Sequence, residues 1–531
     1  ELHDLIVSII SLVYPSLSCL LHNCVSFNSS VYDYLLESLT LGTLVSRSLQ
    51  IPTTHNMFLS CLCDECLIPN SFQLKEKHFY KKHTAIFFTL CDLVRYHSNN
   101  MDLEFWKLVF EPLISCHSIF HWPACGFLDF FLVEKNHKNG WNSRICKHTD
   151  NFFSFINLDS EFDFSHSLKA QKSFVDIVEH NMYENFNAIF IQSKNSSDNS
   201  LIDFLNSLSL MFDELPLSKH NSFVHEQRQS FILGRLFDLY VQNCDIRPQL
   251  IIKPIISVYI KACNVESNKI RSYSIQYFIF VLLSSFSLNS YPDNISYCIK
   301  SLEHFLHSKY HDIRPYIVNA IRMIIIDHKV LLGEHWNSLL SSCCDLLTTK
   351  RIYPSPTFEN SSYNEYVGKQ LLLAMQLIFD QCLKYLSLNS IIQLLMLIQC
   401  YASTTENANN SIVATSYLMT ISDYFCETFQ NEQPQSQIEY FWTEFFNSFC
   451  KISSDPRMSI RKSVIQMLFN IIQVRNTSLN FVIIEKLIKN ELVPLLELSS
   501  QKATDTLSLE DSSFSNNDTV IYHHSRNTPQ K

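Results

Sequence analysis

Histidine and cysteine, the residue types that ligate transition metals, gather first at residues 55–66. His55 precedes Cys61, Cys63 and Cys66 in the spacing H-x5-C-x-C-x2-C. Structural zinc needs four converging nitrogen or sulfur ligands, and C-x2-C loops usually occur in pairs. No second C-x2-C follows, and helical positions 61, 63 and 66 do not converge on one face. We therefore favour buried apolar cysteines over a zinc site.

A second group of possible metal ligands lies at residues 116–148. His117, His121 and Cys125 are spaced i, i+4 and i+8, so they share one helix face if the helix continues past Pro123. The other members are Cys116, Cys146 and His148. A zinc site and ordinary core and surface histidines both fit this spacing. We favour the second interpretation and predict neither a metal nor a cofactor.

Carboxylates and serines could support acid–base or nucleophilic chemistry. Asp159, Glu161 and Asp163 stand close together, but in an expected loop that has no apolar pocket to raise a pKa. The members of a Ser-His-Asp triad come together only in the folded structure, so sequence spacing does not exclude a triad. The G-x-S-x-G turn that presents a serine nucleophile in hydrolases does not occur in the sequence. These observations favour a protein without enzymatic activity.

Glycine is scarce, and this excludes several enzyme classes. The chain has 531 residues and six glycines, whereas a usual content of about 7% would give about 37. The closest two, Gly126 and Gly140, are fourteen residues apart, so neither G-x-G-x-x-G nor G-x-x-x-x-G-K-[ST] can form. Dinucleotide oxidoreductases, P-loop NTPases and kinases, which need such loops, are excluded. Architectures of many strands joined by glycine turns are disfavoured.

Charge and cysteine content indicate the partners and the compartment. With 41 Lys+Arg and 51 Asp+Glu, the net charge is −10, and no long basic run occurs. We therefore predict no nucleic-acid binding. The 18 cysteines are scattered through apolar runs, a pattern typical of reduced cytosolic proteins.

One uncharged stretch is long enough to span a bilayer. Residues 5–32 contain no Asp, Glu, Lys or Arg. The stretch nevertheless contains Pro15, His22 and seven serines. We predict a pair of buried helices here rather than a transmembrane segment.

Apolar residues recur with a helical period along most of the chain. Examples are Phe231–Val241, Ile317–Ile326 and Ile460–Ile472. We predict an all-α fold, an α-solenoid of HEAT/armadillo-like helical repeats, with about eleven or twelve helical pairs at about 45 residues each. The predicted organisation is HEAT-like repeats at 1–135, a polar loop at 136–172, HEAT-like repeats at 173–498 and a flexible loop or frayed end at 499–531.

A recurring phrase, D-x-R-x-x-I-R-x-x-[AS], supports the repeats. It occurs at 312–320 and 455–463 and more loosely at 266–274, with its Ile spaced by 47 and then 143 residues, close to three times 47. We expect the Asp to cap the following helix, and an Arg to pair with the Asp of a neighbouring repeat. The structural or interaction positions are Asp312, Arg314, Asp455, Arg457 and Arg461.

Three tryptophans follow acidic residues in a second recurring phrase. Trp106, Trp336 and Trp442 are each followed by apolar residues. We expect each phrase to open a helix and to place its ring between two helices as a core anchor. Stacking on a ligand is the alternative.

The phrase at 455–469 resembles the D-x-R-P-x-[VI]-R-K-S-A-x-Q-x-L-F stretch of large Golgi and endosome trafficking proteins. Two groups share it: the large Arf guanine-nucleotide exchange factors and the Mon-two family, which lacks their catalytic Sec-seven domain. Residues 416–425 and 521–528 resemble the L-x-x-I-S-D-[YF] and I-H-H-S-R-x-T stretches of the Mon-two family. The matched residues of the last stretch are His523, His524 and Arg526. Met458 and Val318 depart from the pattern, where the family has Pro and Arg.

The resemblance implies a non-enzymatic scaffold in transport between endosomes and the Golgi. Such a protein is cytoplasmic and peripheral on membranes of the Golgi, the trans-Golgi network and endosomes. The implied partners are a Dopey-type protein, Arf-like small GTPases and a phospholipid flippase, and the chain would be a middle to C-terminal piece. Two alternatives stay open: the helical regulatory region of a large Arf exchange factor, and a generic HEAT-repeat transport adaptor such as a nuclear transport receptor, which would bind Ran-type GTPases.

Overall fold

The computed structural model describes most of the chain as helices. The described residues are 2–23, 29–49, 51–66, 81–97, 101–120, 177–213, 222–288, 292–352, 358–404, 407–430, 432–475, 479–494 and 496–497. Over these ranges the regular structure is helical and contains no strand, so the predicted all-α fold is confirmed. The predicted polar loop at 136–172 and the predicted end at 499–531 lie outside the described residues.

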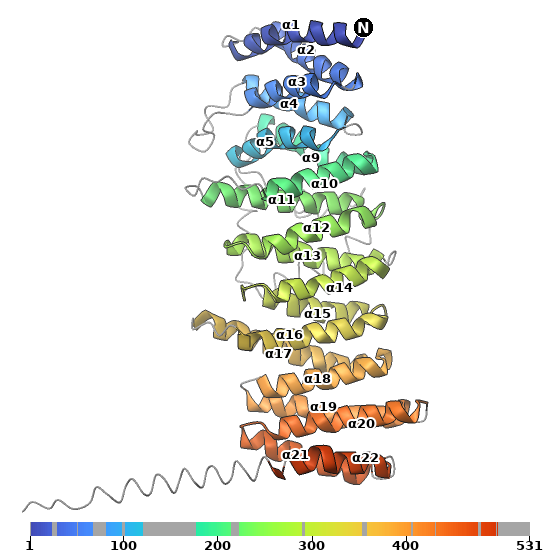
Figure 1. Cartoon of the computed structure of the whole chain (residues 1–531). Coiled ribbons are helices and arrows are strands. Elements are labelled where there is room, and N and C mark those ends of the chain that lie inside the picture. Colours follow the sequence, from blue (N-terminus) through green and yellow to red (C-terminus); the bar gives the residue numbers. More distant parts are fainter. Residues whose placement is uncertain are drawn as a thin grey trace, which may run out of the picture. The chain divides into compact units, whose positions relative to one another are not determined.

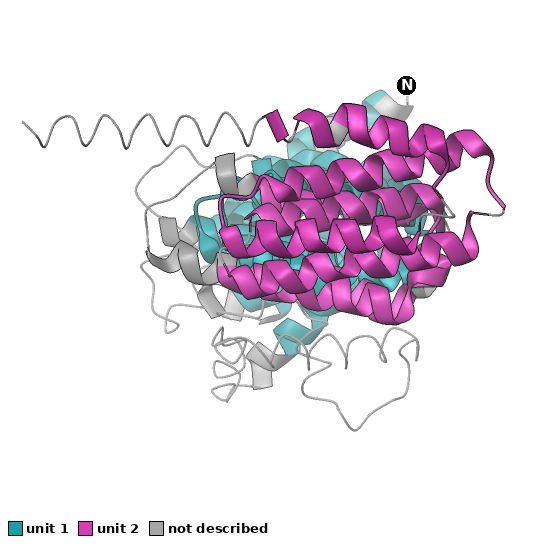
Figure 2. Cartoon of the chain, turned by 90° about the horizontal axis from the view of Figure 1, so that it is seen from below, with its two compact units in different colours: residues 1–320 teal, residues 321–531 magenta. Residues whose placement is uncertain are grey.

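The chain divides into two compact units, at residues 1–320 and 321–531, with the division inside one helix (Figure 2). The helices of the first unit are α1 (Leu2–Asn23), α2 (Ser29–Ser48), α3 (Pro52–Cys66), α4 (Lys81–His97), α5 (Leu103–Phe120), α9 (Ile177–Gln192), α10 (Asp198–Asp213), α11 (Ser222–Asn243), α12 (Pro248–Ala262), α13 (Asn268–Leu288) and α14 (Pro292–Leu306). The division falls in α15 (Arg314–His328). The second unit continues with α16 (Trp336–Ile352), α17 (Phe358–Gln381), α18 (Leu388–Thr404), α19 (Ala408–Thr428), α20 (Gln435–Ser453), α21 (Met458–Val474) and α22 (Phe481–Lys486).

Within each unit, successive helices alternate between two layers. In the first unit α1, α3, α5, α10, α12 and α14 contact one another in order, and α2, α4, α9, α11 and α13 form the second layer (Figure 1). In the second unit α16, α18 and α20 form one layer and α17, α19 and α21 the other. Each helical pair therefore buries its apolar face against the next pair, which is the arrangement of an α-solenoid.

Side-chain caps and prolines define several helix starts. Asn407 accepts hydrogen bonds from the backbone N–H groups of Asn409 and Asn410 at 3.0 and 3.3 Å, which caps α19. Asn480 caps α22 by accepting from the N–H of Ile483 at 2.8 Å. Pro248 is the first residue of α12, where its missing N–H costs nothing.

Two of the described glycines lie at positions that favour a residue without a side chain. Gly333 has a φ of 43°, the left-handed region that glycine tolerates best, in the turn after α15. Gly42 lies in α2, where an added Cβ would approach the ring of Phe58 on α3 to 2.9 Å. Glycine therefore allows the close packing of α2 on α3.

The first two helices correct one prediction. Residues 2–23 and 29–48 do form a helical pair, but its apolar side chains are not all buried. Leu5, Ile9 and Leu12 of α1 are exposed, as are Val31 and Tyr34 of α2. The predicted burial is wrong because α1 is packed by α2 and α3 and contacts no other described helix of the first unit closely. Among the described helices, none combines the length and the apolar character needed to cross a membrane.

Candidate interaction site

The three predicted tryptophans are among the largest fully buried side chains. The ring of Trp106 in α5 stacks on Phe204 of α10, with centroids 4.0 Å apart and an angle of 6°. Trp336 is the first residue of α16, as expected, but Trp442 lies two turns into α20, so its phrase does not open that helix. Because no face of these rings is open to solvent, their burial favours core anchors over ligand stacking.

Arg271 joins two successive repeats in the first unit. Its Nε donates to both carboxylate oxygens of Asp312 at 2.9 and 3.1 Å, from the start of α13 to the turn before α15. Its Nη1 donates to the carbonyl oxygens of Val265 and Glu266 at 2.8 and 2.6 Å. The guanidinium also lies 3.7 Å from the ring centre of Tyr310. The predicted pairing of an arginine with the aspartate of a neighbouring repeat is thus present here.

Asp455 and Arg457 form a local pair in the second unit. The carboxylate of Asp455 accepts from the backbone N, the Nε and the Nη2 of Arg457, each at 2.9 Å. Burial opposes ionisation of Asp455, but the hydrogen bonds from Arg457 outweigh it and lower the pKa of the carboxyl. The predicted helix cap is wrong for Asp455, because Arg457 is the N-cap of α21 and occupies this carboxylate.

Arg457 also reaches the preceding repeat. Its Nη2 donates to the carbonyl of Ala402 at the end of α18, and its Nη1 donates to the hydroxyl of Ser411 in α19 at 3.3 Å. Arg461 stays within its own turn, where Nη1 donates to the carbonyls of Asp455 and Pro456 at 2.8 and 2.6 Å. Arg461, the second arginine of the phrase, therefore stabilises its own turn, as Arg271 also does. Arg457, the first arginine, joins two repeats.

Arg314 has the same sequence position as Arg457 but different surroundings. Its side chain is 3% exposed, its Nε has no hydrogen-bond partner in the described structure, and burial lowers its pKa to about 10. Asp312, two residues earlier, is paired with Arg271 instead. The phrase therefore does not impose one pairing at every repeat. His523, His524 and Arg526 lie outside the described residues.

Arg247 is a structural residue that sequence reasoning missed. It donates to the carbonyl oxygens of Ser193 and Ser196 at 2.8 and 2.7 Å and to Asp198 at 2.8 Å. Like Arg457, Arg247 lies immediately before its own helix, here α12. It binds the turn that precedes α10, two helices earlier in the chain. The letters D-I-R-P at 245–248 repeat those at 312–315, and this match was a signal that could have found it.

Further polar contacts join equivalent helices one repeat apart. They are Arg235–Asn187, Lys261–Asp213, Arg322–Gln370 and Arg475–Asp423, with sequence separations of 48, 48, 48 and 52 residues. Arg235 is fully buried and also binds Asp238 at 2.8 Å. Three of the separations match the spacing of 47 between the repeated phrases to within one residue, so these contacts follow the repeat.

The candidate metal ligands form no metal site in the described structure, although the thiols of Cys66 and Cys116 lie in hydrogen-bond contact. Cys61, Cys63 and Cys66 are buried, and burial raises the pKa of the Cys63 thiol well above its usual value. The Nδ1 of His55 lies 3.0 Å from the amide oxygen of Asn56, and burial lowers the pKa of this imidazole. Within the described ranges, no three His, Cys, Asp or Glu side chains converge as metal ligands would. His121, Cys125, Cys146 and His148 lie outside those ranges.

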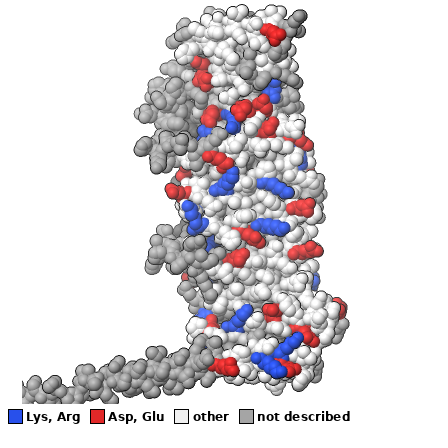
Figure 3. All heavy atoms as spheres, in the orientation of Figure 1, with Lys and Arg blue, Asp and Glu red and all other residues white. Residues whose placement is uncertain are grey.

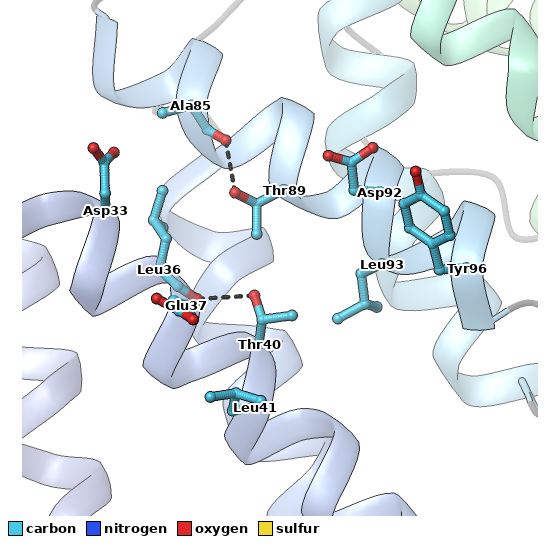
Figure 4. A pocket seen from close by; sticks show the side chains of 10 residues that line it. All are labelled: Asp33, Leu36, Glu37, Thr40, Leu41, Ala85, Thr89, Asp92, Leu93 and Tyr96. Atoms are coloured by element: carbon cyan, nitrogen blue, oxygen red, sulfur yellow. Dashed lines mark hydrogen bonds between the residues drawn. The ribbon is translucent and has the colours of Figure 1, made fainter.

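The described part of the chain includes two surface grooves of several hundred Å³. The first, of about 390 Å³, lies between α2 and α4 (Figure 4). The second, of about 500 Å³, lies in the second unit and is lined by Lys329, Phe379, Asp380, Gln381, Leu383, Lys384, Tyr385 and Tyr424. The second lining mixes both charge signs. On the face shown in Figure 3, Lys and Arg are interspersed with Asp and Glu.

The fold and the contacts define an α-solenoid whose conspicuous polar residues hold its repeats together. No family model matches the chain. It is 26% identical to "Monensin-resistant homolog 2" of Caenorhabditis elegans over 163 residues, and 26% identical to "Protein MON2 homolog" of Caenorhabditis briggsae over the same length. Each match covers 31% of this chain and 10% of the relative. The chain is thus similar to a small part of two MON2 proteins.

Solved structures give only distant matches. An engineered protein aligns with 86% of this chain and 98% of its own, at 10% identity and a TM-score of 0.22. A homology model of the AP-3 complex aligns with 94% of this chain and 92% of its own, at 12% identity and a TM-score of 0.25. Both TM-scores are too low to indicate a shared fold, so the architecture rests on the helices described above.

Proposed function

We propose that this chain is a helical scaffold segment of a Mon-two-like protein in vesicle-mediated transport between endosomes and the Golgi. The observation that carries the proposal is the similarity to the two MON2 homologs. The helical stack supports it, because solenoids offer long surfaces to several partners at once.

The proposed mechanism is the presentation of rigid surfaces rather than catalysis. Partly buried contacts such as Arg271–Asp312 and Arg235–Asn187 join repeat to repeat, so they limit rotation of one helical pair against the next. Binding of a partner to two helical pairs then costs little conformational entropy, because the surface is already ordered. The partners under this proposal are a Dopey-type protein, Arf-like small GTPases and a phospholipid flippase, on the cytoplasmic side of Golgi, trans-Golgi network and endosome membranes.

A second candidate is the helical regulatory region of a large Arf exchange factor. The phrase around Asp455 and Arg457 favours it, because the resemblance of 455–469 extends to both groups. A generic HEAT-repeat transport adaptor is the third candidate, and the repeat contacts alone are compatible with it.

A nucleotide-exchange assay with the full-length protein separates the first two candidates. Arf and Arf-like GTPases loaded with a fluorescent guanine nucleotide would be mixed with the purified protein and excess GTP. The scaffold proposal expects release at the intrinsic rate, and a known Sec-seven domain serves as the positive control. Release accelerated to a rate comparable with that control would overturn the proposal in favour of an exchange factor.

A further inference from the structure

The groove between α2 and α4 has an apolar floor. Leu36 of α2 and Leu93 of α4 line it and are almost fully buried beneath it. In Figure 4, Thr40 of α2 and Leu93 of α4 are directed toward each other across the groove. The two helices are neighbours in the second layer of the first unit, so the groove lies within one compact unit of the chain.

An exposed apolar stripe runs along α2 beside this groove. Val31, Tyr34, Leu41 and Val45 are all exposed, and their spacing of 3, 7 and 4 residues puts them on one helix face. Leu41 belongs both to the stripe and to the groove lining. The stripe and the groove therefore form one continuous surface.

The groove is acidic. Asp33 and Glu37 of α2 and Asp92 of α4 line it, and its lining contains no Lys, Arg or His. Asp33 and Glu37 form no ion pair within the described structure, and Asp92 lies 3.8 Å from Arg95 of its own helix. Tyr96, with a side chain 74% exposed, stands at the α4 side of the groove (Figure 4). Its ring offers an additional binding face for a cationic group.

We propose that this surface binds a basic amphipathic helix of a partner protein. The apolar side of that helix would cover Tyr34 and Leu41, and its Lys or Arg side chains would reach Asp33, Glu37 and Asp92. Helices that dock in grooves use an apolar stripe at i, i+3, i+4 and i+7 in this way. Charge complementarity argues against an anionic bilayer as the occupant, because the three carboxylates would be repelled by anionic headgroups. The inference goes beyond the proposed function, since it assigns one binding surface and the chemistry of its occupant.

The test measures binding of a labelled peptide to the full chain. The probe is an 18-residue helical peptide (about five turns) with Leu on one face and Lys on its flanks, and its matched version carries Glu in place of Lys. We expect the Lys peptide to bind, to lose affinity as salt rises and to bind the double variant D33K/E37K roughly tenfold more weakly. Tyr34→Ser should also weaken binding, because it removes the apolar contact. The control Glu432→Lys, an exposed position in the second unit, should leave the affinity unchanged.

The same variants decide the outcome. All of the changed residues are exposed, so circular dichroism melting should show the variants folded like the original chain. Equal binding of the Lys and Glu peptides, or equal affinity for D33K/E37K and E432K, would overturn the proposal. Binding of the original chain to phosphatidylserine vesicles that is lost in Tyr34→Ser would also overturn it and assign the surface to a membrane.

Discussion

Arg271 and Asp312 form an ion pair between two helical repeats, 41 residues apart in sequence, with the Nε of the arginine 2.9 Å from the nearer carboxylate oxygen. The arginine also binds the turn of its own repeat through Val265 and Glu266. One side chain therefore fixes the start of α13 and connects it to the start of α15. This double role explains why a cation is tolerated in a position with little solvent.

Substitution of Arg271 tests this role. Arg271→Ala should lower the free energy of unfolding by about 2 kcal/mol, because it leaves Asp312 unpaired and the turn carbonyls unsatisfied. Urea unfolding and amide hydrogen exchange in α13 and α15 would measure the loss. Lys269→Ala is the matched control, because Lys269 lies 3.4 Å from Glu226 in an exposed pair worth at most about 1 kcal/mol. Equal effects of the two substitutions would contradict the assigned role.

Arg314 and Arg457 should respond oppositely to the same substitution. Arg314→Met removes a buried cation without an ion-pair partner among the described residues, so stability should stay the same or rise by about 1 kcal/mol. Arg457→Met leaves the carboxylate of Asp455 unpaired and should cost about 3 kcal/mol. The midpoints of urea unfolding measure both effects. A large loss of stability from Arg314→Met would contradict the absence of an ion-pair partner for this arginine.

Trp106 should contribute through packing rather than hydrogen bonding. Its stacked contact with Phe204 lies between α5 and α10, and its indole N–H has no hydrogen-bond partner in the described structure. Trp106→Ala should therefore cost about 3–5 kcal/mol, and Trp106→Phe clearly less, because a phenyl ring keeps the stacked contact. Thermal unfolding of the two variants provides the comparison. If Trp106→Phe were as damaging as Trp106→Ala, a specific need for the indole would replace the packing explanation.

The hydrogen bonds of the Asp455 carboxylate predict how the stability of the chain changes as the pH falls. Its pKa is lower in the folded chain than the usual value of about 3.9. The stabilisation is therefore present above that usual value and is lost as the pH falls through the lower folded pKa. Asp455→Asn should be less stable than the original chain at pH 7, and the difference should shrink at the acidic end. A difference that stays constant between pH 7 and pH 2 would exclude this carboxylate as the source.

Helical periodicity predicted the class of fold because each helix needs an apolar side for the next helical pair. Ile317 and Ile460, for example, lie in helical apolar runs and are fully buried. The phrase could not predict which arginine finds which carboxylate. That choice depends on the neighbouring turn, so Asp312 binds Arg271 whereas Asp455 binds Arg457. The exposure of Leu12 in α1 could not be predicted either. The sequence shows that a helix has an apolar face, but not which element covers that face.

The most direct test of the scaffold proposal is affinity capture of the full-length protein from cells, followed by mass spectrometry. The capture should use mild detergent, and an unrelated HEAT-repeat protein should serve as the control bait. The proposal predicts recovery of a Dopey-type protein together with Golgi and endosome membrane proteins. Recovery of Ran-type GTPases and nuclear transport cargo, without those proteins, would contradict it and favour a generic transport adaptor.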